Sequence, residues 1–351
     1  MKILLYVYCA AFLFVGSCAE TKHSVKIDNL KKSIQLADSI EVVKYANTIT
    51  PQELKDIVYE FASDDFFGRE AGEEGQHKAA QYIKTFYVNN QIPSPLSTGD
   101  HIQHIDKIFF EDLIKNDSEN VLAYVEGSKY PEEVIILSAH LDHLGYDEDT
   151  KEIYNGADDN GSGTAAVLQI AQAFQQAKVD GFAPKRSVLF LHVTAEENGL
   201  YGSRYYLKNP VFPLENTVCD LNIDMIGRVD AAHQNNRNYL YLIGSDKLST
   251  ELHYVSEKVN NTFYQIDLDY TLSDELDRNR FYYRSDHYNF AKNNIPVIFY
   301  FNGTHKDYHL PTDTADKIDY DLLALRSKLI FSTAWQLANQ DHRIQVDKVA
   351  Q

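Results

Sequence analysis

Short apolar runs alternate with longer amphipathic segments along most of the chain. The apolar runs are rich in Val, Ile, Leu and Phe and have the length of buried strands. They cover residues 120–125, 134–138, 187–193, 218–223, 239–243 and 295–301. Helices are expected at residues 51–62, 75–88, 164–177 and 322–339. Because strands and helices alternate, the sequence predicts an α/β fold with a sheet layered between helices.

Local signals mark two of these helices. Thr50 followed by Pro51 is a typical helix start, because threonine caps the first turn and proline fits its first position. In a later segment, Val167, Ala171 and Phe174 fall on one stripe at helical spacing. Residues 92–100 and 231–238 are expected to form loops, and the chain shows no internal repeat. We therefore expect one domain over residues 49–351.

The first residues predict export instead of folded structure. Residues 3–14 form an apolar run that is shorter than the about 20 residues of a membrane-spanning helix and suits a signal peptide. Small residues then precede Cys18, an arrangement that resembles a bacterial lipidation site. We expect a lipoprotein signal peptide at 1–17, lipidation of Cys18, and a polar tether and N-terminal segment at 18–48. An ordinary signal peptide cleaved nearby is the alternative.

Both alternatives place the mature chain outside the cytoplasm, and lipidation would anchor it in the bacterial cell envelope, facing the periplasm or the surface. The formal net charge of −18 argues against nucleic acid and anionic lipid as partners. Membrane contact is therefore expected only through the lipid anchor. Beyond Cys18 the chain has one cysteine, Cys219, so no intrachain disulfide is expected there. Cys219 lies in an apolar run, which favours a buried side chain.

Ionisable side chains follow three of the expected strands directly. These residues are His140, Asp142, His143, Glu196, Glu197 and Asp224. In open α/β sheets the carboxyl ends of parallel strands form a shared crevice for ligands. A carboxylate in that position is costly to bury without a partner, and a metal ion is one solution. After the last strand, either His305 or His309 could reach the same crevice.

A glycine-rich loop at residues 156–163 leads into an expected helix and carries two aspartates. It could be a simple turn with a helix cap, or it could supply a metal ligand. A calcium loop of the EF-hand type is excluded, because with Gly161 as sixth position the first would be Gly156, which has no carboxylate. Ser162 lacks the Gly-x-Ser-x-Gly frame of a hydrolase nucleophile.

These motifs, in this order, resemble peptidase family M28, the co-catalytic zinc peptidases. The matching motifs are His140-x-Asp142, Gly-x-x-Asp159-Asn-Gly-Ser-Gly, Glu196-Glu197, Asp224 within Asn-Ile-Asp-Met-Ile-Gly, and Asp-Tyr-His309-x-Pro-x-Asp. Each motif is common alone, but their order after suitable strands is specific from about residue 51 onward. The resemblance implies a three-layer α/β/α sandwich around a mixed, mostly parallel central sheet, the fold of the zinc exopeptidases.

The resemblance also implies a ligand set for two Zn²⁺ ions, with Co²⁺ or Mn²⁺ as alternative metals. Asp159 would bridge the ions, and the other ligands would be His140 and Asp224 at one ion and Glu197 and His309 at the other. Asp159 is preferred over Asp158 because Asn-Gly-Ser-Gly follows it at the family offset. His143 is expected to be a polar residue near the site, without a ligand role.

Two further roles follow from the same resemblance. Glu196 would be the general base, and Asp142 would orient His140 through its other ring nitrogen. Residues 285–287 would shape the pocket, and Arg69 would be structural instead of a pocket cation. The implied activity is that of an aminopeptidase that hydrolyses N-terminal residues of a peptide substrate through a metal-bridging hydroxide.

Four alternatives stay open within this reading of the chain. They are a dipeptidase, a carboxypeptidase-like enzyme, a glutaminyl-cyclase-like relative, and a non-catalytic binding protein on the same fold. The intact pair of Glu196 and Glu197 argues against the cyclase, in which the acidic pair is altered. The sequence leaves the side-chain preference and the oligomeric state open.

Overall fold

The structure, a computed structural model, describes residues 24–349, which fall into two compact units. The first unit ends at Leu36 and contains a helix over residues 24–33. The second begins at Ala37 and contains the sheet and the predicted metal and catalytic residues. Cys18 and the predicted signal peptide lie outside the described residues. Within residues 24–349, no helix is long and apolar enough to cross a membrane.

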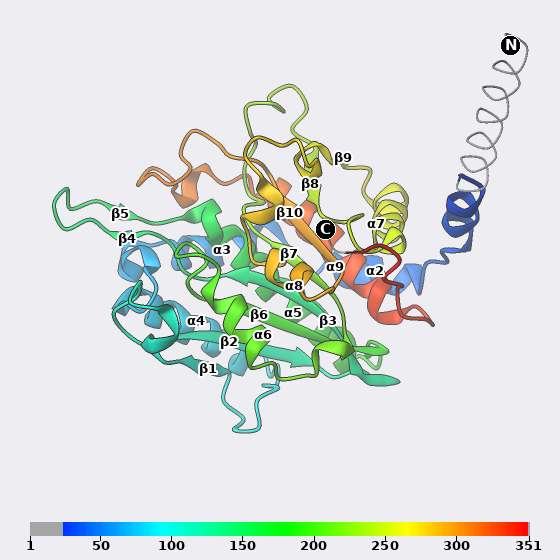
Figure 1. The fold of residues 1–351 in the computed structure, drawn as a ribbon, viewed down its shortest axis with the longest axis horizontal. Helices are drawn as coiled ribbons and strands as arrows, with labels where there is room; N and C mark the ends of the chain where they lie inside the picture. Colours follow the sequence, from blue (N-terminus) through cyan, green and yellow to red (C-terminus); the bar gives the residue numbers. More distant parts are fainter. Residues whose placement is uncertain (1–23, 350–351) are drawn as a thin grey trace, which may run out of the picture. The chain divides into compact units, whose positions relative to one another are not determined.

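One eight-stranded mixed sheet forms the centre of the second unit (Figure 1). Its strands are β1 Ile102–Ile105, β2 Ser118–Val125, β3 Tyr130–His140, β6 Arg186–Val193, β7 Thr217–Ile223, β8 Tyr239–Ile243, β9 Asp267–Asp269 and β10 Val297–Phe301. They lie in the order β1-β2-β6-β3-β7-β10-β8-β9. The four central strands β6, β3, β7 and β10 run parallel, whereas β1, β2 and β8 introduce antiparallel pairs. A small hairpin of β4 Gly145–Tyr146 and β5 Ile153–Tyr154 stands apart.

Every predicted strand coincides with an observed one. The largest difference concerns β3, which begins at Tyr130 instead of residue 134. Its first residues include Pro131 and two glutamates, so they carry no apolar signal. They pair with the start of β6 through a shifted register. The edge strands β1 and β9 were not predicted, because they are short and polar.

The helices of the second unit are α2 Ser39–Ala46, α3 Pro51–Phe61, α4 Glu74–Asn89, α5 Gly163–Val179, α6 Tyr201–Lys208, α7 Thr250–Phe263, α8 His287–Lys292 and α9 Tyr320–Asn339. The predictions of α3, α4, α5 and α9 are confirmed. The expected cap of α3 is present, since Oγ1 of Thr50 accepts from the N–H of Glu53 at 3.2 Å. The other helices were missed because their sequences carry many polar and tyrosine positions.

Helices cover both faces of the sheet (Figure 1). On one face α4, α5 and α9 contact the strands, and α2, α3 and α7 pack onto these helices. On the opposite face lie the shorter helices α6 and α8. The prediction of a three-layer α/β/α sandwich around a mixed sheet is confirmed. The helix α2, which precedes the expected domain start at residue 49, packs against α5 and α9.

Alternation along the central strands divides the core into two layers. In β3, Val134 and Ile136 belong to the cluster that includes Phe290 of α8. In β6, Phe190 points to the other layer, where its ring centroid lies 6.3 Å from that of Phe174 in α5. Phe174 in turn stacks on Trp335 of α9 at 5.7 Å. Burial of α5 between sheet and α9 explains why this helix is apolar on nearly all sides.

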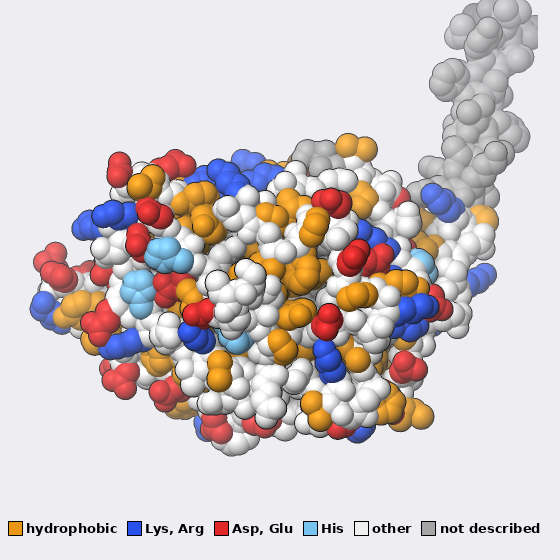
Figure 2. All heavy atoms as spheres, turned by 90° about the horizontal axis from the view of Figure 1, so that it is seen from below, with side chains coloured by type: hydrophobic (Ala, Val, Ile, Leu, Met, Phe, Trp, Pro, Cys, Tyr) orange, Lys and Arg blue, Asp and Glu red, His pale blue; other side chains and the backbone are white. Residues whose placement is uncertain are grey.

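The placement of Cys219 follows the expectation from the sequence. Cys219 is a buried free cysteine in β7. On the face drawn in Figure 2, acidic and basic side chains are interspersed among apolar and uncharged ones. On this face, therefore, the excess negative charge is spread out and does not form a single patch.

Candidate active site

The carboxyl ends of the four parallel strands meet along one edge of the sheet. His140 is the last residue of β3 and pairs in register with Val193, the last residue of β6. Asp224 follows β7 directly, and Ile223 at the end of β7 pairs with Tyr300 of β10. Parallel neighbours in this register deliver the residues that follow them to the same place. This is why side chains distant in sequence meet here.

A loop between β5 and α5 brings Asp159 to this edge. The peptide bond between Asp159 and Asn160 is cis. Asn160 fastens the loop, since its Nδ2 donates to the carbonyl of Ile223 at 2.8 Å and its Oδ1 accepts from the N–H of Gly163 at 2.9 Å. A Cβ on Gly163 would lie 2.4 Å from that carbonyl oxygen, so only glycine fits. The Asn-Gly-Ser-Gly sequence therefore serves the approach of the loop to β7.

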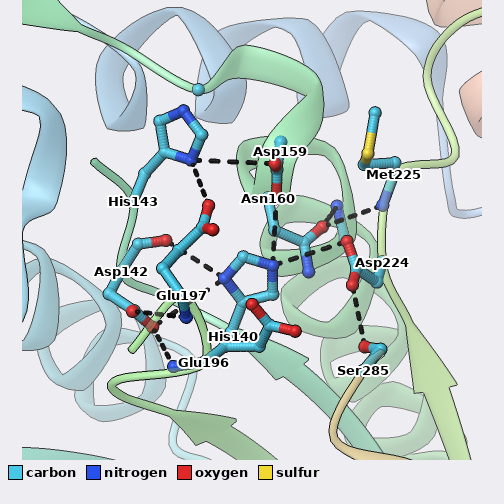
Figure 3. Close-up of polar contacts among 12 residues, drawn as sticks. His140, Asp142, His143, Asp159, Asn160, Glu196, Glu197, Asp224, Met225 and Ser285 are labelled. Carbon is cyan, nitrogen blue, oxygen red and sulfur yellow. Dashed lines mark hydrogen bonds and ion pairs between the residues drawn. The ribbon is translucent and has the colours of Figure 1, made fainter. Parts of the chain in front are cut away.

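One group of ligand-type atoms consists of His140, Asp159 and Asp224 (Figure 3). Nε2 of His140 lies 3.2 Å from Oδ1 of Asp159 and 3.4 Å from Oδ1 of Asp224. The other oxygen of Asp224 accepts a hydrogen bond from Oγ of Ser285 at 2.7 Å. Ser285 therefore orients Asp224, so that one oxygen is left to face His140.

The second group of ligand-type atoms consists of His143, Asp159 and Glu197, so it includes the histidine that was expected to have no ligand role. His309 lies beside this group and contacts both of its carboxylates. Oδ2 of Asp159 lies 3.1 Å from Nε2 of His309, which lies 3.3 Å from Oε2 of Glu197. Nδ1 of His143 lies 2.7 Å from Oε1 of Glu197 and 3.8 Å from Oδ2 of Asp159. The 2.7 Å contact has the length of a hydrogen bond. His143 thus holds one oxygen of Glu197, while the other oxygen faces His309.

The spacing within both groups fits tetrahedral metal coordination. Donor atoms about 2.0–2.2 Å from a zinc ion lie about 3.3–3.6 Å apart along the edges of a tetrahedron. The Nε2 atoms of His140 and His309 lie 3.1–3.4 Å from their carboxylate partners. Imidazole and carboxylate donors without thiolates are also the set found where a zinc site keeps a position open. The donor types and their spacing therefore fit the coordination of zinc-type ions.

Charges within the cluster are strongly coupled. Burial acts to lower the pKa of His309, but hydrogen bonds to Asp159 and Glu197 raise it to about 10. Burial acts to raise the pKa of Asp159, yet its contacts with the surrounding histidines hold it well below the usual range. The carboxylates thus favour positive charge at the ring nitrogens. A metal ion would supply this charge and would compete with protons for the same atoms.

Glu196 and Glu197 are adjacent in sequence but have different surroundings. Glu197 belongs to the second group, whereas Glu196 belongs to neither and lines the adjacent cavity. Burial raises the pKa of Glu196 well above its usual range. Burial would also raise the pKa of Glu197, but its histidine partners lower it. The two neighbouring carboxylates therefore differ in proton affinity.

Asp142 supports both halves of the site through different atoms. Its main-chain carbonyl accepts from Nδ1 of His140 at 3.1 Å, whereas its carboxylate lies 3.8 Å from that nitrogen. The carboxylate instead accepts from the N–H groups of Glu196 at 3.2 Å and Glu197 at 3.4 Å (Figure 3). Asp142 therefore holds the backbone of the glutamate pair as well as the ring of His140.

Asp313, the last residue of the Asp-Tyr-His309-x-Pro-x-Asp motif, is a buried support to which the sequence analysis assigned no role. Its Oδ2 accepts from the N–H groups of Asp158 at 2.9 Å and Asp159 at 3.1 Å. His305, the other histidine of that loop, lies 3.2 Å from Oδ2 of Asp158 and not in either group. Asp158 faces away from the groups, since its Oδ1 accepts from the N–H of Gly227 at 2.7 Å.

Arg69 is structural, as expected, but its partners are carbonyls and not a carboxylate. The fully buried guanidinium donates to the carbonyl of Leu141 at 3.0 Å and to that of Phe61 at 3.1 Å. It also reaches the carbonyls of Asn155 at 2.6 Å and Gly156 at 2.9 Å. One side chain thus joins the end of α3, the segment after β3 and the start of the Asp159 loop.

A cavity of about 490 Å³ opens beside the cluster. Six of its lining residues are phenylalanine or tyrosine, and the ring of Tyr308 stacks on that of His309 with centroids 3.8 Å apart. Residues of both groups and Glu196 line one side. The cavity therefore gives a ligand direct access to the atoms that face the two groups.

Comparison with known proteins agrees with this architecture. A probable zinc metalloprotease of Pyricularia oryzae is 27% identical over 63% of this chain and 50% of its own length. A probable aminopeptidase of Saccharomyces cerevisiae is 24% identical over 78% of this chain and 70% of its own length. The chain thus spans about half the length of the first relative. A zinc aminopeptidase from Bacillus subtilis superposes with a TM-score of 0.64 at 14% identity, over 84% of this chain and 96% of its own.

Fold and site together define a metallopeptidase-type α/β protein. The family model described as peptidase family M28 matches residues 120–334, which include all three strand ends with ionisable residues, the Asp159 loop and His309. The chain belongs to peptidase family M28.

Proposed function

We propose that the chain is a two-metal exopeptidase, most simply an aminopeptidase that removes N-terminal residues from peptides. One observation carries the proposal: the two oxygens of Asp159 face two separate histidine–carboxylate groups at ligand spacing. A single metal would not need both oxygens in this arrangement. The family membership and the relatives named as aminopeptidases support the same reading.

Five residues would hold the metals. His140 and Asp224 would bind one ion, Glu197 and His309 the other, and Asp159 both. Three carboxylates leave a single positive charge on two Zn²⁺ ions, which suits binding of a polarised carbonyl and a deprotonated water. Two such ions would polarise the scissile carbonyl and lower the pKa of water between them. Relatives named as zinc proteins favour zinc over cobalt or manganese.

The chain's own acid–base group would be Glu196. Its raised pKa and its place in the cavity wall suit a carboxylate that takes a proton from water and passes it to the leaving amine. Asp142 would set the direction of Glu196 by holding its N–H. His143 would fix Glu197 by hydrogen bonding and would not itself need to bind a metal.

We also propose that the mature chain is exported and anchored by lipid on Cys18. The apolar run at residues 3–14 and the small residues before Cys18 support this. Metabolic labelling with a fatty-acid analogue would test it, with Cys18→Ala as the matched variant. Label that persists in Cys18→Ala, or a wild-type chain that takes up none, would rule the anchor out.

The activity is tested with amino-acid anilides and the full, metal-loaded chain. We expect hydrolysis of leucine anilide, loss of activity with a chelator and recovery with Zn²⁺. The N-acetylated anilide should resist cleavage, because an aminopeptidase requires the free amine. Bound metal should reach two ions per chain. If two ions bind but no peptide or anilide is hydrolysed, the proposed metal centre is correct and the proposed peptidase activity is wrong.

A further inference from the structure

The cavity beside the metal cluster has charged residues of two kinds. The acidic ones are Asp159, Glu196, Glu197 and Asp224, all in or next to the metal groups. The arginine and lysine residues in its lining are Arg204, Arg284 and Lys292. We call these three residues the cationic rim. Such a gathering is unexpected in a chain with a net charge of −18.

Two members of the rim come from helices that are tied together. Arg204 lies on α6 and Lys292 is the last residue of α8. Asn289 of α8 joins the two helices, because its Nδ2 donates to the carbonyl of Leu200 at 2.9 Å and to Oγ of Ser203 at 2.8 Å. The fold therefore holds two like charges on the same side of the cavity.

Neighbouring groups neutralise this pair only in part. Arg204 forms an ion pair with Glu111 at 3.1 Å, but the Glu111 side chain is 70% exposed. The Nε of Arg204 is buried without a hydrogen-bond acceptor within the described residues. Lys292 forms no ion pair with any residue that the structure describes. Burial lowers the pKa of Lys292, and the nearby charge of Arg204 lowers it further. Both groups thus retain capacity for an anion.

Aromatic rings fix the orientation of the rim. The guanidinium carbon of Arg204 lies 3.9 Å from the ring centroid of Tyr201, and Nζ of Lys292 lies 4.9 Å from that of Tyr288. On the side nearer the metals, Nη2 of Arg284 donates to the hydroxyl of Tyr308 at 3.2 Å. Arginine held on a ring loses less freedom when it binds a carboxylate.

We propose that the cationic rim binds a carboxylate of the substrate, so that the enzyme prefers peptides with a negative charge next to the cleaved bond. This rests on the proposed peptidase function and specifies its substrate class. The reacting carbonyl would lie at the metal cluster, and the carboxylate would extend along the aromatic wall to Arg204 and Lys292. A substrate without a carboxylate would leave the charges of the rim without a partner.

The carboxylate could come from an acidic side chain or from the C-terminus of a short peptide. Matched substrates separate these sources. Glutamyl anilide and glutaminyl anilide differ only in side-chain charge, whereas Leu-Leu and Leu-Leu-amide differ only in the terminal carboxylate. We expect kcat/KM to favour the charged member of one pair by about tenfold, the effect of one charge-assisted hydrogen bond.

The variants Lys292→Gln and Arg204→Gln test which residues cause the preference. Each should raise KM for the charged substrate more than for its neutral partner and reduce the advantage of the charged substrate to about twofold. Lys208→Gln is the control, because Lys208 lies on the same α6 as Arg204 and does not line the cavity. It should keep the wild-type preference.

Calorimetry on the Glu196→Gln variant gives a readout that does not need turnover. Uncleaved peptides with the charge should bind more tightly than their neutral partners, and Lys292→Gln in that background should remove the difference. Equal kinetics and equal binding within both pairs would overturn the carboxylate site while leaving the peptidase intact. If charged peptides bind more tightly than neutral ones but no substrate is hydrolysed, the carboxylate site is supported and the proposed peptidase function is wrong.

Discussion

The carboxylate of Asp159 is shared between two histidines, with Oδ1 3.2 Å from Nε2 of His140 and Oδ2 3.1 Å from Nε2 of His309. The two rings come from distant parts of the chain. His140 is at the end of β3, and His309 is in the loop after β10. The fold thus makes one side chain the common member of both groups. Any change to it should affect both at once.

Replacement of Asp159 by Asn should therefore remove metal from both positions. Asparagine keeps one oxygen but presents an amide nitrogen to the second histidine, and it lacks the negative charge. We expect fewer than one ion per chain by elemental analysis, and no measurable hydrolysis. Asp149→Asn, an exposed aspartate in the turn between β4 and β5, is the control and should keep two ions. Retention of one tightly bound ion in Asp159→Asn would contradict the shared role.

Substitutions of Glu196 and Glu197 should affect different properties, turnover in the first case and metal binding in the second. In Glu196→Gln, kcat should fall by about 10²- to 10⁴-fold, the usual effect of a lost general base, while two ions per chain remain. In Glu197→Gln, metal content should fall, because this residue faces His309. Elemental analysis beside single-substrate kinetics distinguishes the two variants. Metal loss in Glu196→Gln would show that the roles were assigned the wrong way round.

The central strands and the residues after them could be predicted because each signal is local. A buried parallel strand needs a continuous apolar run, and the residue that ends it, such as His140 or Asp224, is fixed within a few positions. Contacts made by distant backbone groups leave no such signal. Asp313 accepts two N–H groups more than 150 residues away, and nothing in its own segment indicates this.

The elements that were missed depend on tertiary packing. Helix α6 has only eight residues, of which three are tyrosines and two are basic, so the segment is too short and too polar to stand out as a helix in the sequence. It is a helix because Tyr206 and Leu207 reach the cluster on the sheet. The cationic rim was missed for the same reason, since Arg204 and Lys292 meet only once α6 and α8 are packed. Sequence spacing alone does not bring them together.

Arg69 should be a stability determinant that lysine cannot replace. Its guanidinium donates to four carbonyls from three segments, whereas an ammonium has three donors and no planar fork. At least one buried carbonyl would lose its partner in Arg69→Lys, which costs about 1–3 kcal/mol. We expect the free energy of unfolding in urea to fall by that amount. Arg278→Lys, at an exposed arginine, should leave it unchanged, and an equal loss in both would reject the interpretation.

Buried His192 should make the protein less stable in acid. Burial lowers the pKa of His192 to about 3, and its Nε2 is 2.7 Å from the hydroxyl of Tyr87. In the unfolded chain a histidine has a pKa of about 6.5, so between these values the unfolded state binds the extra proton. The contribution of neutral His192 to the free energy of unfolding is therefore fully present above about pH 6.5. Below that pH it decreases by up to about 1.4 kcal/mol for each unit by which the pH is lowered.

Replacement of His192 by Gln should remove this contribution, since glutamine can still bond to Tyr87 but does not titrate. Between pH 7 and pH 5, the free energy of unfolding of the wild type should fall by about 2 kcal/mol more than that of His192→Gln. Urea titrations at both pH values measure the difference. His104→Gln serves as the matched control, because the His104 side chain is 63% exposed. A wild-type slope that persists in His192→Gln would show that other groups cause the acid sensitivity.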